Sequence, residues 1–150
     1  MPKRQDYQPP AFLVSSVFII IDIKDDVTDV TTKLMLRRNN KAAADAPLWL
    51  DGRDIELTRL TIDAVEVPIS GDICENVTIF DHGVLLAGLE DDVTIELQSR
   101  CYPEANTALE GLYLSSGMYC TQCEPEGFRR IGYFTDRPDV MCVFTVRIEA

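Results

Sequence analysis

Short runs of alternating apolar and polar residues restrict the fold of this sequence more than any other feature. Residues 30–37 and 92–98 alternate with a period of two, which is typical of strands with one buried face. Turn-forming residues separate such runs at spacings of about ten positions, and no window of about 11 or more residues keeps a helical period. The pattern predicts an all-β fold, with a sandwich or a saddle-like pair of antiparallel sheets.

The length of the chain, residues 1–150, predicts a single domain with one hydrophobic core. Around Thr58 the apolar residues Ile55, Leu57, Leu60 and Ile62 do not keep one phase, which predicts a bend or a β-bulge. Residues 1–11 are rich in proline and predict an extended leader. Further strands are expected at residues 12–23, 48–50, 65–69, 76–80, 83–87 and 141–148.

Charge and hydropathy exclude two classes of partner. The net charge is -11, with 25 acidic against 14 basic residues, whereas nucleic-acid binding requires clustered Lys and Arg. The longest apolar run covers residues 17–21, far short of the roughly 20 residues that a membrane span needs. No apolar segment follows the first charged residues, and the chain has 5 cysteines, an odd number. We therefore expect reduced thiols, a cytoplasmic location, and neither nucleic acid nor membrane as a partner.

The pair Cys120-x-x-Cys123 is the clearest candidate for metal chemistry within the chain. A structural zinc site would need two further thiolate or imidazole ligands, usually as a second close pair. The other cysteines are isolated in the sequence, and His82 is the only histidine. The zinc peptidase motif His-Glu-x-x-His therefore cannot be encoded here. A redox role would need a helix start in a βαβ unit, which the pattern lacks, so we expect two packed, reduced thiols and no metal site.

Three neighbouring runs carry a family resemblance. They are Asn-Thr-Ala-Leu-Glu-Gly-Leu-Tyr at 106–113, Cys-Thr-Gln-Cys-Glu-Pro-Glu-Gly-Phe-Arg at 120–129, and Tyr133 with Asp-Arg-Pro-Asp-Val at 136–140. This block resembles the N-terminal domain of the aminopeptidase N family, most of all its bacterial alanyl branch. These zinc peptidases remove single residues from peptide N-termini. The resemblance is weaker over 45–54, and the chain departs from it at Pro125 and Arg130.

The resemblance implies that Gln122 and Glu124 are substrate-binding residues. Glu124 would bind the free α-ammonium group of the peptide, and Gln122 would help to line the pocket for the first side chain. A charge-assisted hydrogen bond suits this role, because an internal peptide segment would leave the buried carboxylate without a partner. Without the resemblance, residues 124–127 would be interpreted as a solvated turn. The resemblance also implies a cis peptide bond between Glu124 and Pro125.

In this family the zinc lies in a later domain, so the resemblance implies no cofactor here and zinc in the full-length enzyme. The chain ends in strand-like sequence at 146–150, and we expect the catalytic domain to lie outside it and the chain alone to be inactive. The surface that docks on that domain should be exposed, which predicts self-association around 120–128 or the final strand. Trp49 and Tyr113 are expected to be core or interface aromatics.

An alternative from another class is a stand-alone acidic β-sandwich that binds a partner protein. The sequence that follows Ala150 would separate the two hypotheses. A Gly-x-Met-Glu-Asn segment followed by His-Glu-x-x-His would decide for the peptidase.

Overall fold

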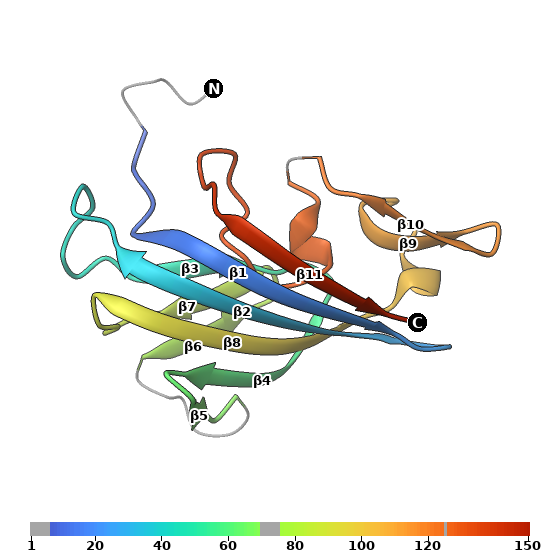
Figure 1. Ribbon diagram of the computed structural model, residues 1–150, viewed down its shortest axis with the longest axis horizontal. Coiled ribbons are helices and arrows are strands. Elements are labelled where there is room, and N and C mark those ends of the chain that lie inside the picture. The colour runs from blue at the N-terminus through green and yellow to red at the C-terminus, as the bar shows by residue number, and fades with distance from the viewer. Residues whose placement is uncertain (1–6, 70–75, 125) are drawn as a thin grey trace.

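The computed structural model describes residues 7–69, 76–124 and 126–150, and in this part of the chain it confirms the all-β prediction (Figure 1). The only helical elements described are short 3₁₀ turns, and none of them could cross a membrane. The elements are β1 (Phe12–Ile23), β2 (Thr28–Arg38), β3 (Leu48–Asp51), β4 (Glu56–Ile62), β5 (Val65–Val67), β6 (Val77–Phe80), β7 (Gly83–Leu86), β8 (Asp92–Cys101), η2 (Pro103–Ala105), β9 (Gly111–Ser115), β10 (Met118–Gln122), η3 (Phe128–Arg130) and β11 (Val143–Glu149).

A six-stranded sheet in the order β11-β1-β2-β8-β4-β5 forms the front layer in Figure 1. Its pairs are antiparallel except one, because β11 runs parallel to β1 from Ser16↔Val143 to Asp22↔Glu149. The sheet is therefore mixed rather than purely antiparallel as expected. A parallel neighbour requires a long crossover, and here the connection from the end of β1 to the start of β11 includes all the other strands. The register shift between Leu57 and Arg59 confirms the bulge predicted near Thr58.

The core lies between this sheet and a second layer, the three-stranded sheet β3-β7-β6, which lies behind it in Figure 1. The alternation seen in the sequence accounts for the packing, because every second residue of β2 and β8 is buried. The sandwich prediction is thereby confirmed. The fully buried residues of the two layers include Leu34, Leu60, Ile95, Leu48, Leu50, Val84 and Leu86.

A separate hairpin, β9–β10, projects beyond the sandwich at one end (Figure 1). The strands are joined by Ser116 and Gly117, whose φ values of 50° and 81° fit the two-residue turns that favour hairpins. At the base of the hairpin, Gly111 has φ 73°, and a Cβ there would lie 2.6 Å from Cβ of Arg130. This close approach fixes the hairpin against η3.

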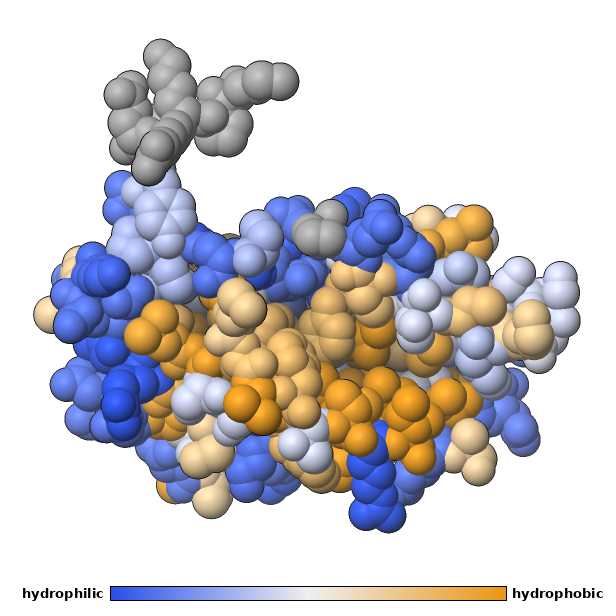
Figure 2. Space-filling view, turned by 45° about the horizontal axis from the view of Figure 1, so that its top comes forward, coloured by the Kyte–Doolittle hydropathy of each residue, from blue (hydrophilic) through white to orange (hydrophobic). Residues whose placement is uncertain are grey.

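The strand β11 is left largely uncovered. Parallel partners share a face of the sheet, so Phe144, Val146 and Ile148 point to the same side as the core residues of β1. They are nevertheless 49%, 51% and 65% exposed, because the second layer does not reach them. Only Phe144 finds aromatic partners, with its ring 6.5 Å from Phe128 and 5.6 Å from Phe134 between centroids. The apolar band along β1 and β11 in Figure 2 confirms that the final strand remains exposed.

Candidate substrate-binding loop

A tight loop joins the end of β10 at Gln122 to the start of η3 at Phe128. The backbone N–H of Gly127 donates a 2.7 Å hydrogen bond to the carbonyl oxygen of Glu124. A Cβ at position 127 would lie 2.6 Å from the carbonyl oxygen of Gln122, so this closure has no room for a side chain. Pro125 lies outside the described residues, and the cis bond predicted before it stays a prediction.

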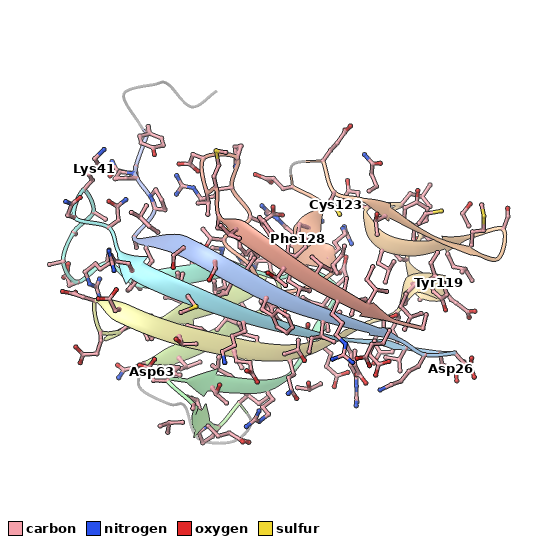
Figure 3. All side chains as sticks on the ribbon, in the orientation of Figure 1. Asp26, Lys41, Asp63, Tyr119, Cys123 and Phe128 are labelled. Atoms are coloured by element: carbon pink, nitrogen blue, oxygen red, sulfur yellow. The ribbon has the colours of Figure 1, made fainter. Side chains whose placement is uncertain are left out.

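The structure places both predicted binding residues on this loop, two positions apart, and both are exposed. Within the described part of the chain, no hydrogen bond or ion pair engages the amide of Gln122 or the carboxylate of Glu124. Cys123, between them, is also exposed as a whole residue. Burial and then the nearby Asp136 carboxylate raise the pKa of its thiol above the ordinary value, and Figure 3 shows it at the end of the hairpin, near η3. Gln122 and Glu124 are thus available to a ligand.

Arg129 in η3 lies behind the loop and contacts three carboxylates. Its Nε and its backbone N–H each donate to Oδ2 of Asp136 at 3.1 Å, and Nη2 donates to the carbonyl oxygen of Asp136 at 2.9 Å. Its Nη1 lies 3.5 Å from Oδ1 of Asp51 and 3.4 Å from Oε2 of Glu126. Burial lowers the pKa of Arg129, but Asp136, Asp51 and Glu126 together raise it above the ordinary value.

Asp51 connects this cluster to the second layer of the sandwich. Its Oδ1 accepts a 2.9 Å hydrogen bond from Nε1 of Trp49, and its Oδ2 accepts a 3.0 Å bond from the backbone N–H of Asp136. The backbones of Asp51 and Phe134 also exchange hydrogen bonds of 2.7 and 3.1 Å. Asp136 therefore bonds both to a distant strand and to η3. The ring of Trp49 packs against those of Phe80 and His82, as expected of a structural aromatic.

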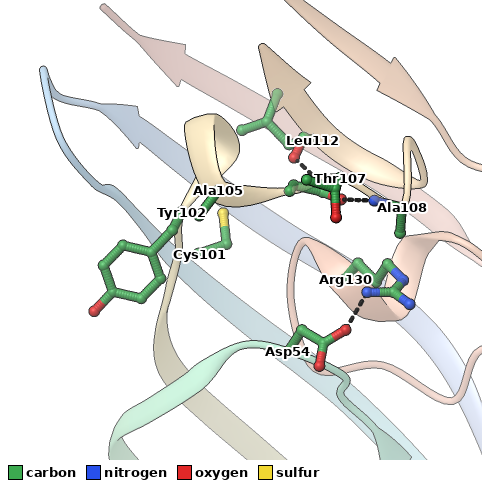
Figure 4. Close-up of a pocket in the computed structure, with 9 residues that line it drawn as sticks. Asp54, Cys101, Tyr102, Ala105, Thr107, Ala108, Leu112 and Arg130 are labelled. Carbon is green, nitrogen blue, oxygen red and sulfur yellow. Dashed lines mark hydrogen bonds and ion pairs between the residues drawn. The ribbon is translucent and has the colours of Figure 1, made fainter.

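A cavity of about 240 Å³ lies on the other side of η3 (Figure 4). Arg130 lines it and forms ion pairs with Asp54 and, at 3.1 Å, with Glu110. These two carboxylates neutralise the guanidinium, so the cavity offers no unpaired charge from this side chain. The wall also includes Cys101, whose thiol points into the space between η2 and the strands. No local sequence pattern predicts this cavity, because its lining comes from three separate segments.

No group of three or more His, Cys, Asp or Glu side chains is arranged to hold a metal ion anywhere in residues 7–69, 76–124 and 126–150. In particular, Cys120 and Cys123 are free thiols. The donor set of the described residues does not fit a zinc ion, and no chemical step follows from a metal held by them.

Comparison with known proteins supports the resemblance found in the sequence. No family model matches the chain. Aminopeptidase N of Escherichia coli is 37% identical over 147 residues, which make up 98% of this chain and 16% of that protein. Aminopeptidase N of Caulobacter vibrioides is 37% identical over 97% of the chain, and that of Haemophilus influenzae is 34% identical over 98%. This chain matches the N-terminal domain of aminopeptidase N.

Solved structures give the same answer for the fold. Aminopeptidase A of Legionella pneumophila, in complex with aspartic acid, superposes with a TM-score of 0.86 at 25% identity over 98% of this chain and 17% of its own. An M1 zinc metallopeptidase from Deinococcus radiodurans, a mutant bound to a Tyr-Ser-Ala substrate, gives 0.71 at 15% identity over 92% of this chain. The second likeness shows the fold alone. Because the chain spans about one sixth of the curated aminopeptidases N, their activity belongs to a larger protein.

Proposed function

We propose that this chain is the substrate-facing N-terminal domain of a zinc aminopeptidase, and that its loop 122–127 binds the free N-terminus of a peptide. The observation that carries the proposal is the match to aminopeptidases N at 34–37% identity across 97–98% of the chain. The geometry of the loop supports it, because Gln122 and Glu124 are exposed on a closed turn held against the body of the domain.

Glu124 provides the charge that the reaction class requires. An exopeptidase must select a free ammonium group, and a carboxylate pairs with it through a charge-assisted hydrogen bond. This bond strengthens when a second domain covers the loop and removes water, because the effective dielectric constant falls. Gln122 offers both a donor and an acceptor for contacts near the first side chain. By pairing with the ammonium group, Glu124 therefore fixes the position of the first peptide bond, which is the bond that is cut.

The rest of the machinery lies in another domain of the same polypeptide under this proposal. The exposed apolar side chains of Phe144, Val146 and Ile148 on β11 support such a neighbouring domain, since a contiguous exposed apolar patch commonly marks an interface. Zinc would be bound in that domain, and purified chain alone should hold no stoichiometric zinc and hydrolyse no aminoacyl reporter. The free thiols at Cys101, Cys120, Cys123 and Cys142 support a reducing, cytoplasmic location.

The test is a chimera in which this chain replaces the matching 147-residue segment of Escherichia coli aminopeptidase N. The unmodified chimera should hydrolyse aminoacyl reporters. Glu124→Gln keeps the size of the side chain and removes its charge, and it should lower kcat/KM at least about 30-fold, the lower end of the cost of breaking one side of a buried charge pair.

The matched control is Glu104→Gln, which removes one charge from an exposed carboxylate in η2. It should leave kcat/KM unchanged. If Glu124→Gln behaves like this control in an active chimera, Glu124 is not part of the substrate site.

A further inference from the structure

The two binding residues depend on a small buried ionic cluster for their support. Arg129, Asp51 and Asp136 are 18%, 13% and 14% exposed at their side chains, whereas Gln122 and Glu124 are exposed. The cluster joins the end of β3, the 3₁₀ turn η3 and the segment that follows Phe134. It is thus one point at which the loop is attached to the sandwich, beside the 2.8 Å hydrogen bond from the backbone N–H of Arg53 to the carbonyl oxygen of Arg129.

Arg129 provides the positive charge that the carboxylates of this cluster share. Asp51 and Asp136 are in direct contact through the backbone N–H of Asp136, at 3.0 Å from Oδ2 of Asp51. Without the guanidinium, two partly buried carboxylates would face each other with no cation between them. Like charges in a low-dielectric site repel strongly, and an uncompensated buried charge is costly. Loss of Arg129 should therefore move η3 away from β3.

Three contacts transmit such a movement to the loop. Glu126, within the loop, reaches Nη1 of Arg129 at 3.4 Å. The backbone N–H of Arg130 donates to the carbonyl oxygen of Gly127 at 3.2 Å, so η3 is continuous with the closing turn of the loop. Cys123 lies close enough to Asp136 for that carboxylate to act on its thiol. Residues on both sides of Glu124 are thus tied to the same cluster.

We propose that Arg129 is the positioning residue of the amine-binding loop. By bridging Asp51, Asp136 and Glu126, it fixes the position of Glu124 relative to the sandwich. This inference rests on the proposed function of Glu124. Arg129 acts through the loop and does not itself touch the substrate. Neighbouring Arg130 has a different task, because its guanidinium turns to Asp54 and Glu110 at the cavity.

The geometry requires arginine rather than any cation. Nε, Nη1 and Nη2 of Arg129 each point to a different acceptor, and the planar guanidinium holds these donors in a fixed fork. Lysine carries the same charge on a single nitrogen and cannot satisfy the same set. Arg129→Lys should therefore keep the positive charge and lose part of the positioning, whereas Arg129→Met should lose both.

The experiment uses the chimera with Escherichia coli aminopeptidase N and two inhibitors, leucine hydroxamate and its des-amino analogue. The two share the metal-binding hydroxamate and the side chain, and they differ only in the amine that Glu124 would bind. Arg129→Met should weaken leucine hydroxamate about 10- to 100-fold, the scale expected for a misplacement of about 1 Å. Affinity for the des-amino analogue should stay within about twofold. Arg129→Lys should give an intermediate loss for the first inhibitor alone.

Arg59→Met is the matched control, because Arg59 is also a partly exposed arginine in two ion pairs, but its partners Glu66 and Glu96 lie on the six-stranded sheet and outside the cluster. It should change neither affinity. Equal losses for both inhibitors would show a merely structural role and overturn the inference, as would no loss for either. If Arg129→Met fails to fold, the same comparison is made with Arg129→Lys, which must still separate the two inhibitors.

Hydrogen exchange on the chain itself gives an independent measurement. Arg129→Lys should speed exchange of the Gly127 amide, which is bonded to Glu124, and leave the amides between β2 and β8 unchanged. Uniform acceleration would contradict the positioning role. The two hypotheses can be refuted separately. If Glu124→Gln has no effect, the proposed binding of the ammonium group by Glu124 is wrong. If Glu124→Gln has an effect and Arg129→Lys has none, only the positioning role of Arg129 is wrong.

Discussion

The centre and the rim of the six-stranded sheet are built from the same kind of strand but differ in what covers them. In the centre, β2 and β8 alternate between buried and exposed residues, and the second layer covers the buried ones. At the rim, Val146 and Ile148 of β11 point to the same side and remain half exposed or more. The centre is therefore covered within the chain, whereas the rim leaves apolar side chains exposed.

The largest expected effect contrasts one residue from each region. Leu50→Ala removes a fully buried side chain between the layers and should lower the free energy of unfolding by about 2–5 kcal/mol. Ile148→Ala removes a side chain of the same size from β11 and should cost less than about 1 kcal/mol, because the residue is mostly in water. Urea unfolding of the two variants measures both values. Similar losses of unfolding free energy in the two variants would mean that β11 is covered in solution, and the contrast between the centre and the rim of the sheet would then be wrong.

A smaller effect depends on pH and on the buried thiol of Cys101. Burial, with a contribution from Asp29, raises the pKa of Cys101 to about 11, above that of an unfolded thiol. The folded state thus holds its proton more tightly, so this contribution to stability is complete below about pH 9 and is lost as pH rises towards 11. Relative to Cys101→Val, the unmodified chain should lose about 1–3 kcal/mol between pH 8 and 11.

Urea unfolding under reducing conditions at several pH values measures this difference. The valine variant is the reference, because the other ionising groups, including Tyr133 with its pKa raised by burial to about 12, are common to both proteins and cancel. A difference that does not change with pH would show that Cys101 is accessible to water.

The smallest effect on stability, but a clear one on association, is expected at the rim. We predict that the chain alone self-associates through β11, whose edge and apolar row are both open. Val146→Lys places a charge in that row and should reduce the average mass towards the monomer, with stability unchanged within about 0.5 kcal/mol. Thr145→Lys, on the opposite face of the same strand, should have a weaker effect. Ultracentrifugation that finds only monomers of the unmodified chain at high concentration would refute the prediction.

Local pattern was enough to predict most of the fold. The period-two runs gave β2 and β8, and the phase change around Thr58 located the bulge, because these features depend only on neighbouring residues. The hairpin β9–β10 was not predicted, since neither of its strands alternates cleanly between buried and exposed residues. The parallel placement of β11 was not predicted either, because pairing between distant strands leaves no local signature.

The binding site was predictable only in part. The resemblance pointed to Gln122 and Glu124, and the structure places both on one exposed loop, while their role remains a proposal. The support behind them was missed, because Asp51 and Asp136 are 85 positions apart and their contact is made only in the folded chain. The available signal was the density of charges around Arg129, which by itself is equally typical of a solvated turn.

The pairing of β1 with β11 also has a consequence for biosynthesis. Ser16 and Val143 are partners, yet the ribosome makes them 127 positions apart, from position 16 to position 143. At a synthesis rate of about 5–20 residues per second, roughly 6–25 s pass between the two. During this interval one edge of β1 has no neighbour, although β2 can already pair with the other. The nascent chain must therefore keep one edge of β1 unpaired and soluble until β11 has been synthesised. A chaperone, or a wrong partner, would first bind at that edge.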